Sequence, residues 1–134
     1  LTVLFPLNSL AGKFVKNPND GSAVEMLEYK GNRFLFTGDA EAAAERKLAG
    51  LGVDLKADVL KVGHHGSNTS TTEGFLSEIK PQVAVIEVGA KNRYGHPRKE
   101  VLGRLEKFGV KYYRTDMDGT VEIVSDGVNF KIIK

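Results

Sequence analysis

The alternation of strand and helix patterns in the middle of the chain is the feature that most constrains its fold. Three short segments, RFLFT (33–37), DVLKV (58–62) and VAVIEV (83–88), have the composition of strands. The last of them is almost entirely apolar and β-branched, as expected of a strand inside a sheet. Because a helical pattern follows each of these strands, the order of elements predicts an α/β (layered α+β) domain.

Three helices are predicted between and after these strands. Residues 39–52 are rich in Ala and Glu, carry acidic residues early and basic residues late, and end in glycine. Ser70 and Glu73 have the spacing of a capping box, which predicts a helix from Ser70 to about Ile79. Pro97 suits the first position of a helix over residues 97–108. The buried stripe expected for that last helix is Val101, Leu102, Leu105 and Phe108.

The remaining segments are predicted as strands and turns. TVLF (2–5) reads as a short strand, and SAVEMLEY (22–29) is expected to form a hairpin with 33–37. Three more strands follow the last helix, joined by a DMDG turn and an SDG turn. With 134 residues and no internal repeat, the chain is expected to be a single domain over 1–134, with an irregular lead-in over 1–21.

Composition excludes a few classes of site. The chain has no cysteine, so disulfides and thiolate metal sites are excluded. A net charge of +2 provides no general attraction to nucleic acid or membranes. The sequence has no basic signal-peptide region and no apolar run approaching the roughly 20 residues of a transmembrane helix. Because it begins with Leu1 rather than Met, we expect a piece of a longer protein whose targeting signals lie outside it.

Three loops that follow strands carry the candidate chemistry. They are FTGDAE (36–41), VGHHGSN (62–68) and NRYGHPR (92–98), and in each an Asp or His directly follows a glycine. The Asp and His residues at these glycine-flanked positions are Asp39, His64, His65 and His96, which account for every histidine of the chain. Imidazole and carboxylate groups suit zinc, manganese or iron. Loops at strand ends are also where functional residues concentrate.

Each of these residues also has a purely structural explanation. Asp39 precedes a helical pattern and could be its N-cap, and His96 could simply start the helix that follows it. The doubled histidine could be surface decoration. In an extended segment adjacent side chains point to opposite faces, so only one of the two would face a pocket unless Gly63 and Gly66 permit a kink.

Other candidate sites are weaker on their sequence patterns. A hydrolase that pairs Ser67 with a histidine is conceivable, but no G-x-S-x-G motif is present and Ser67 could bond local backbone. The DMDG segment (116–119) lacks the remaining ligands of a calcium loop and is interpreted as a turn. A basic set around His96 could attract a polyanion or could be a solvated helix face; it comprises Lys91, Arg93, Arg98, Lys99, Arg104 and Lys107.

Taken together, the TGD, VGHHGS and NRYGHP motifs, each between a strand and a helix, resemble the C-terminal half of the metallo-β-lactamase fold. Residues 22–134 more closely resemble the C-terminal metallo-β-lactamase-like domain of ComEC-type competence (DNA-internalisation) proteins. The resemblance implies the C-terminal half of an αββα sandwich, in which the doubled histidine lines the active-site cleft.

The resemblance also implies roles for individual residues. Asp39 matches a metal-bridging aspartate and His96 a late histidine ligand. His64 and His65 are the expected catalytic residues, one of them facing the metal or a substrate phosphate, and the sequence leaves open which. The expected substrate-binding residues, in the same motifs, are Ser67, Asn68, Asn92, Arg93 and Tyr94. The divalent metal of the parent protein would be zinc or manganese.

The H-x-H-x-D-H ligand motif of the superfamily is absent from this chain. The resemblance therefore implies half of an active site, so that the chain alone would hold no metal tightly and would be inactive. The implied function is a metal-dependent, nuclease-like phosphodiesterase associated with DNA uptake. The alternatives are a non-catalytic module that binds or guides DNA, and a stand-alone hydrolase with another substrate.

Partners and location follow from the same resemblance. The expected partners are DNA or another phosphodiester and the remainder of the parent chain. One face of the sheet is expected to lack a cover, which predicts a homodimer through that face, or its capping by residues 1–32 within a monomer. The parent is expected in the cell membrane with this domain outside the cytoplasm, the alternative being a cytoplasmic enzyme.

Overall fold

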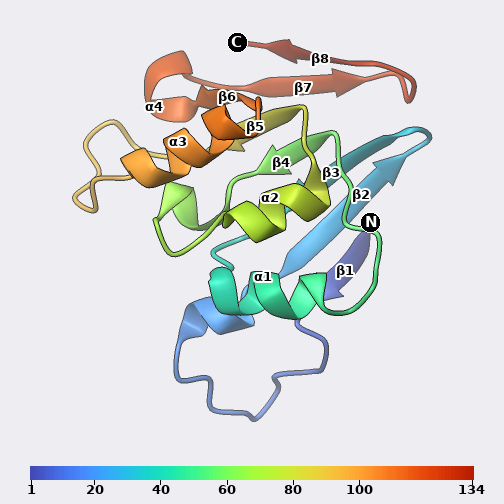
Figure 1. Ribbon diagram of the computed structural model, residues 1–134, viewed down its shortest axis with the longest axis vertical. Coiled ribbons are helices and arrows are strands. Elements are labelled where there is room, and N and C mark those ends of the chain that lie inside the picture. Colours follow the sequence, from blue (N-terminus) through green and yellow to red (C-terminus); the bar gives the residue numbers. More distant parts are fainter.

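The alternating strands form a six-stranded mixed sheet in the computed structural model, which describes residues 1–134. The strand order is β1-β2-β3-β4-β5-β6 (Figure 1). The strands are β1 (Thr2–Phe5), β2 (Val24–Tyr29), β3 (Asn32–Phe36), β4 (Val59–Lys61), β5 (Val83–Ile86) and β6 (Lys111–Arg114). The first three pair antiparallel, and β3 to β6 pair parallel, as the intervening helices require. The α/β class is therefore confirmed.

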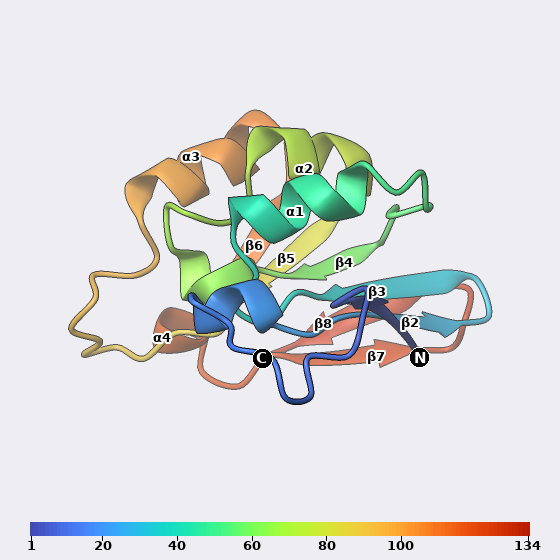
Figure 2. The same cartoon turned by 90° about the horizontal axis from the view of Figure 1, so that it is seen from below.

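Helices cover one face of this sheet. They are α1 (Ala42–Ala49), α2 (Glu73–Ile79) and α3 (Lys99–Lys107), and Figure 2 shows all three on the same side. The face beneath them is set by alternation along the strands, because Leu35, Leu60 and Ala84 stand in register and are completely buried. They belong to a core of 20 buried residues.

A separate two-stranded hairpin packs on the opposite face. It consists of β7 (Glu122–Ser125) and β8 (Phe130–Ile133), which follow β6 and one helical turn, α4 (Thr115–Asp118). Figure 2 shows the hairpin on the side of the sheet opposite the three helices. The second row of in-register residues, Phe34, Val59 and Val83, is buried on this side, where Ile123, Phe130 and Ile132 pack. The three C-terminal strands are thus confirmed as strands, but two of them leave the main sheet.

The sequence predicted that one whole face of the sheet would lack a cover, but only part of that face is uncovered. The hairpin covers part of it, and residues 1–32 do not cap it, because β1 and β2 extend the sheet at its edge. A groove of about 420 Å³ remains between the sheet and β7, lined mainly by apolar side chains such as Leu27, Tyr29 and Phe36. The homodimer stays a prediction, limited to this groove.

Several predicted helix ends were also wrong. Thr72, not Ser70, caps α2, because its side chain accepts from the Phe75 N–H, while the Ser70 hydroxyl is buried and donates to backbone carbonyls. Helix α3 begins at Lys99 with Arg98 as its N-cap, so Pro97 lies before the helix and is not its first residue. Phe108 is 37% exposed and lies outside the buried stripe. The DMDG segment lies within α4 and the glycine after it.

The lead-in is more ordered than expected. Between β1 and β2 it contains a short 3-10 helix, η1 (Pro18–Gly21), with Asn17 as its side-chain cap. None of the helices has the length and hydropathy needed to cross a membrane.

Candidate functional site

The three predicted loops meet at one edge of the sheet. The strands β3, β4 and β5 run parallel, so the TGD segment, the doubled histidine and the segment containing His96 all leave the carboxyl ends of neighbouring strands. This is the edge at which open α/β sheets bind their ligands. The topology therefore explains how residues far apart in the sequence come to share a site.

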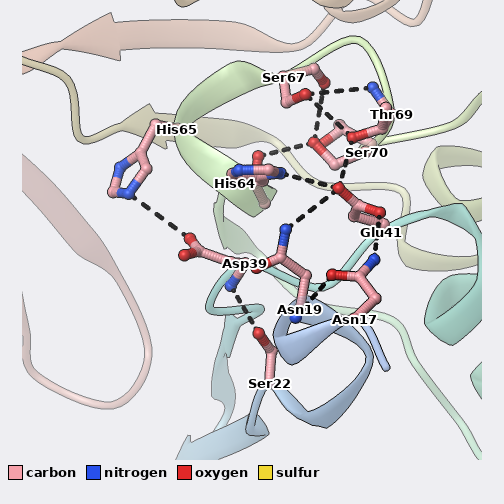
Figure 3. Close-up of polar contacts among 12 residues, drawn as sticks. Asn17, Asn19, Ser22, Asp39, Glu41, His64, His65, Ser67, Thr69 and Ser70 are labelled. Carbon is pink, nitrogen blue, oxygen red and sulfur yellow. Dashed lines mark hydrogen bonds and ion pairs between the residues drawn. The ribbon is translucent and has the colours of Figure 1, made fainter. Parts of the chain in front are cut away.

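The doubled histidine lies in a short kinked turn, η2 (Gly63–Gly66), rather than in an extended segment. Both residues have left-handed backbone, with φ of 46° for His64 and 53° for His65. Glycine is required at position 66, where φ is positive and a Cβ would lie 2.6 Å from the Cβ of Pro97. At position 63 a Cβ would lie 3.0 Å from the carbonyl oxygen of Ala40. The kink directs both imidazoles toward the TGDAE segment (Figure 3).

His65 pairs with Asp39. Its Nε2 lies 3.5 Å from Oδ1 of Asp39, and both side chains are substantially exposed. Its Nδ1 lies 2.7 Å from the carbonyl oxygen of Glu87, which can only accept, so Nδ1 carries the proton and donates. In the neutral imidazole the lone pair is then on Nε2, which faces Asp39 and solvent, an arrangement that a cation shared by the two groups would stabilise. A carbonyl oxygen on the other ring nitrogen is how proteins commonly orient a histidine that binds a metal.

His64 occupies a more enclosed position and pairs with Glu41. Its Nδ1 lies 3.2 Å from Oε1 of Glu41, and its side chain is 25% exposed, against 47% for His65. Burial opposes ionisation of Glu41, but hydrogen bonds from Asn19, Thr69 and Asn17 outweigh it and lower the pKa of the carboxyl. An ionised Glu41 attracts the imidazole electrostatically, although Nδ1 of His64 is buried and makes no hydrogen bond.

His96 lies beside His64. The ring centroids of His64 and His96 are 5.8 Å apart. The Tyr94 ring stacks on His96, with 5.9 Å between the two centroids. The Asn92 amide fixes the loop by accepting from the N–H of His96 and donating to its carbonyl. Burial, followed by the nearby charges of His64, Arg98 and His65, lowers the pKa of His96. Its Nδ1 is buried without a hydrogen-bond partner.

Two open depressions meet at His65. One, of about 620 Å³, is lined by Asp39, Lys61 and residues of β2 and β3. The other, of about 360 Å³, is lined by Asn92, Tyr94 and His96. His65 and Glu87 line both. The site is therefore an open, elongated surface rather than an enclosed pocket.

The donors fit a divalent metal only in part. Two ligands of one tetrahedral ion, each about 2.1 Å from it, are about 3.4 Å apart, so the 3.5 Å between His65 and Asp39 suits a shared ion. However, no three His, Asp or Glu side chains in the chain gather closely enough to hold an ion by themselves. Asp39 and His65 could hold a metal together with further ligands.

The predicted substrate-binding residues are placed unevenly. Asn68, Arg93 and Tyr94 are exposed, and the Arg93 guanidinium lies 5.2 Å from the centre of the Tyr94 ring. Ser67 is 5% exposed and its hydroxyl bonds with that of Thr69. Asn92 is half-buried and bonded within its own loop. Their roles toward a substrate stay predictions.

Sequence reasoning missed the residues that hold the doubled-histidine loop in place. The buried carboxylate of Glu45 in α1 accepts hydrogen bonds from the N–H groups of Thr71 and Thr72 and from the Thr72 hydroxyl. Arg104 of α3 donates to the carbonyls of Asn68, Ser70 and Thr71. Arg104 is thus a structural clamp rather than part of a free basic surface, and Lys107 pairs with Glu73.

Lys61, Glu41 and the asparagines of the lead-in were missed as well. The Lys61 ammonium donates to the Gly38 carbonyl at 3.3 Å and lies 3.7 Å from Glu87. The only sequence signal for Lys61 was its position two residues before the histidine loop. Nothing in the spacing of Asn17, Asn19 and Glu41 indicates that they meet, because their contact depends on the route of the lead-in.

Comparison with known proteins identifies the family of this chain. Residues 2–89 match the model of the metallo-beta-lactamase superfamily, and the chain belongs to that superfamily. It is 41% identical over 104 residues to ComE operon protein 3 of Bacillus subtilis (strain 168). It is 39% identical over 105 residues to Competence protein ComA of Neisseria gonorrhoeae and 42% identical over 106 residues to Recombination protein 2 of Haemophilus influenzae.

Each of these alignments covers 78% of this chain but only 13–15% of the relative. The resemblance to the metallo-β-lactamase-like domain of ComEC-type competence proteins is therefore confirmed, for one part of proteins that are much longer.

Proposed function

We propose that this chain supplies the C-terminal part of the active site of a metal-dependent hydrolase that cleaves phosphodiester bonds of DNA during DNA uptake. The observation that carries the proposal is the pairing of His65 with Asp39, in which the Glu87 carbonyl leaves the histidine Nε2 free. Membership of the metallo-beta-lactamase superfamily supports a hydrolase. The similarity to a protein named for competence supports a role in DNA uptake.

In this proposal each side chain has a definite task. Asp39 and His65 would hold a zinc or manganese ion together with ligands from the remainder of the parent. His96, which lines the adjoining depression, would be a further metal ligand. The bound ion would activate water and stabilise charge on the phosphate oxygens. His64, when it carries a proton on Nε2 as well as on Nδ1, either donates the Nε2 proton to the leaving oxygen or hydrogen-bonds the phosphate with it. Ser67 is buried, so its part is to hold the loop.

An open site suits a polymeric substrate. The two depressions that meet at His65 leave room for a strand to pass, and Arg93, Tyr94 and Asn68 are exposed where they could contact it. Exposed aromatic and basic side chains bind nucleic-acid strands by stacking and by charge. We place the parent in the cell membrane with this domain outside the cytoplasm, as the resemblance to ComEC-type DNA-internalisation proteins implies.

The second candidate is a module that guides DNA without cutting it. It is favoured by the lack of any cluster of three potential metal ligands in the chain. In that case the same exposed residues would bind DNA, and Asp39 and His65 would only shape the surface.

The test compares the 134-residue chain with the longer parent protein, each incubated with zinc or manganese and labelled DNA. We expect little cleavage by the chain alone and cleavage by the parent that Asp39→Ala or His65→Ala abolishes. Asp54→Asn, an exposed acid bonded to Arg33 away from the site, is the matched control. A parent that binds DNA but leaves it intact with either metal would favour the guiding module.

A further inference from the structure

Glu41 has a set of contacts that the proposed reaction does not explain. It occupies the N-cap position of α1, where its side chain makes no capping hydrogen bond. Glutamate is a poor choice for that position compared with Ser, Thr, Asp or Asn. Its carboxylate turns instead toward the doubled histidine (Figure 3).

The carboxylate of Glu41 is held by donors from two separate segments. Asn17 donates to Oε2 at 3.1 Å, and Asn19 donates to Oε1 at 3.2 Å, both from the lead-in. The Thr69 hydroxyl donates to Oε1 at 3.0 Å from the other side. With three donors in place, the carboxylate has a fixed position, and His64 Nδ1 lies 3.2 Å from Oε1.

The same part of the lead-in also holds the neighbouring motif. The Ser22 hydroxyl accepts from the N–H of Asp39 at 3.2 Å. Residues 17–22 therefore contact both Asp39 and Glu41, and Glu41 in turn lies beside His64 (Figure 3).

We propose that Glu41 is a positioning residue, which holds His64 in the tautomer with the proton on Nδ1 and so leaves Nε2 as the nitrogen available for chemistry. Nδ1 of His64 is buried and makes no hydrogen bond, and Oε1 of Glu41 lies 3.2 Å from it. An unprotonated Nδ1 would direct its lone pair at this anionic oxygen, whereas the oxygen attracts a proton on Nδ1. His65 is held in the same tautomer by the Glu87 carbonyl. Residues 17–22 are part of the site because they fix Glu41. This inference rests on the proposed function only for the use made of His64.

The test is nitrogen NMR of the histidine side chains in the 134-residue chain, recorded at increasing pH until the imidazole signals no longer move. We expect His64 to carry its proton on Nδ1. In Glu41→Ala and Glu41→Met the proton should move mainly to Nε2, the nitrogen protonated in free histidine. Glu41→Gln should retain the Nδ1 proton, because its amide oxygen can still accept.

His65 is the internal control, since its acceptor is a backbone carbonyl that none of these variants removes. Its Nδ1 proton should stay in place in all of them, which also reports that the sheet edge is folded. The inference is overturned if His64 of the unaltered chain carries its proton on Nε2. It is equally overturned if Glu41→Ala and Glu41→Met leave the His64 tautomer unchanged.

Activity of the parent separates this inference from the proposed function. If the parent cleaves DNA, Glu41→Ala should lower kcat about 10–100-fold, as for other residues that orient a reacting group, with KM little changed, and Glu41→Gln should restore most of it. A parent without cleavage but with the expected tautomers would refute the hydrolase and leave the role of Glu41 standing.

Discussion

The two loops that carry histidines are held in different ways. The loop containing His64 and His65 is fastened from outside, by Glu45 on α1, Arg104 on α3 and Glu41 at the start of α1. The loop containing His96 is fastened mainly from within, by the amide of Asn92. The first loop therefore depends on the packing of two helices. The second depends on its own asparagine and is joined to the first at its end, where the Arg98 N–H donates to the Gly66 carbonyl at 2.9 Å.

Removing Glu45 should produce the largest loss of stability. Glu45 is 2% exposed, and Glu45→Ala leaves the buried N–H groups of Thr71 and Thr72 without an acceptor. We expect the free energy of unfolding to fall by about 2–4 kcal/mol, measured by urea denaturation. Glu78→Gln, on the exposed side of α2, is the control and should change it by less than about 0.5 kcal/mol. Equal effects of the two would mean that the loop does not depend on α1.

Replacing Arg104 should have the next largest effect. Arg104→Met keeps the length of the side chain but removes the hydrogen bonds to the carbonyls of Asn68, Ser70 and Thr71. We expect a loss of about 1–2 kcal/mol, together with faster amide exchange over residues 67–72. Lys107→Met on the same helix removes only an exposed ion pair and should cost about 0.5 kcal/mol or less. No difference between the two variants would contradict a clamping role.

Asn92→Ala should act locally on the second loop. It removes the bonds to the backbone of Gly89 and His96 but touches no helix core. The expected cost is about 0.5–1.5 kcal/mol, with faster amide exchange confined to residues 89–97. Exchange that also increases over residues 63–72 would show that the two loops are not independent.

The smallest expected effect is a pH dependence that comes from His96. Its folded-state pKa is lowered, so between that value and the ordinary 6.5 the unfolded chain binds more protons. The free energy of unfolding should therefore fall as the pH drops through about 6.5, and the loss is complete once the pH is below the folded pKa. His96→Gln should flatten this part of the stability curve. A curve unchanged by the substitution would refute the assignment to His96.

The sequence predicted the order of elements and the three motifs well, because strand alternation and glycine-flanked polar residues are local signals. It did not predict the N-cap of α2, since Ser70 and Thr72 are equally good caps and the buried hydroxyl of Ser70 was taken by the backbone of Gly63. It could not decide between His64 and His65, because the answer depends on positive φ angles that place both at the site.

The sequence did not predict the residues that hold the histidine loop in place, and the reason is different. Glu41, Glu45 and Arg104 occupy ordinary helical positions, and their roles arise only when α1 and α3 pack beside the histidine loop. The sequence also did not predict that β7 and β8 cover the second face of the sheet. The buried side chain of Asn32 holds them there, because it accepts from the Ser125 hydroxyl and donates to the Val128 carbonyl. These contacts join residues more than 90 positions apart, so no local pattern indicates them.

Titration of the chain with Mn²⁺, followed by paramagnetic broadening of NMR signals, tests the central claim most directly. If Asp39 and His65 form the chain's share of a metal centre, the first signals to broaden should be those of His65, residues 38–41 and residues 63–67. Signals of β7 and β8 should be spared, and Asp39→Ala should remove the selectivity. Uniform broadening, or broadening that begins at another acidic group and survives Asp39→Ala, would contradict the account.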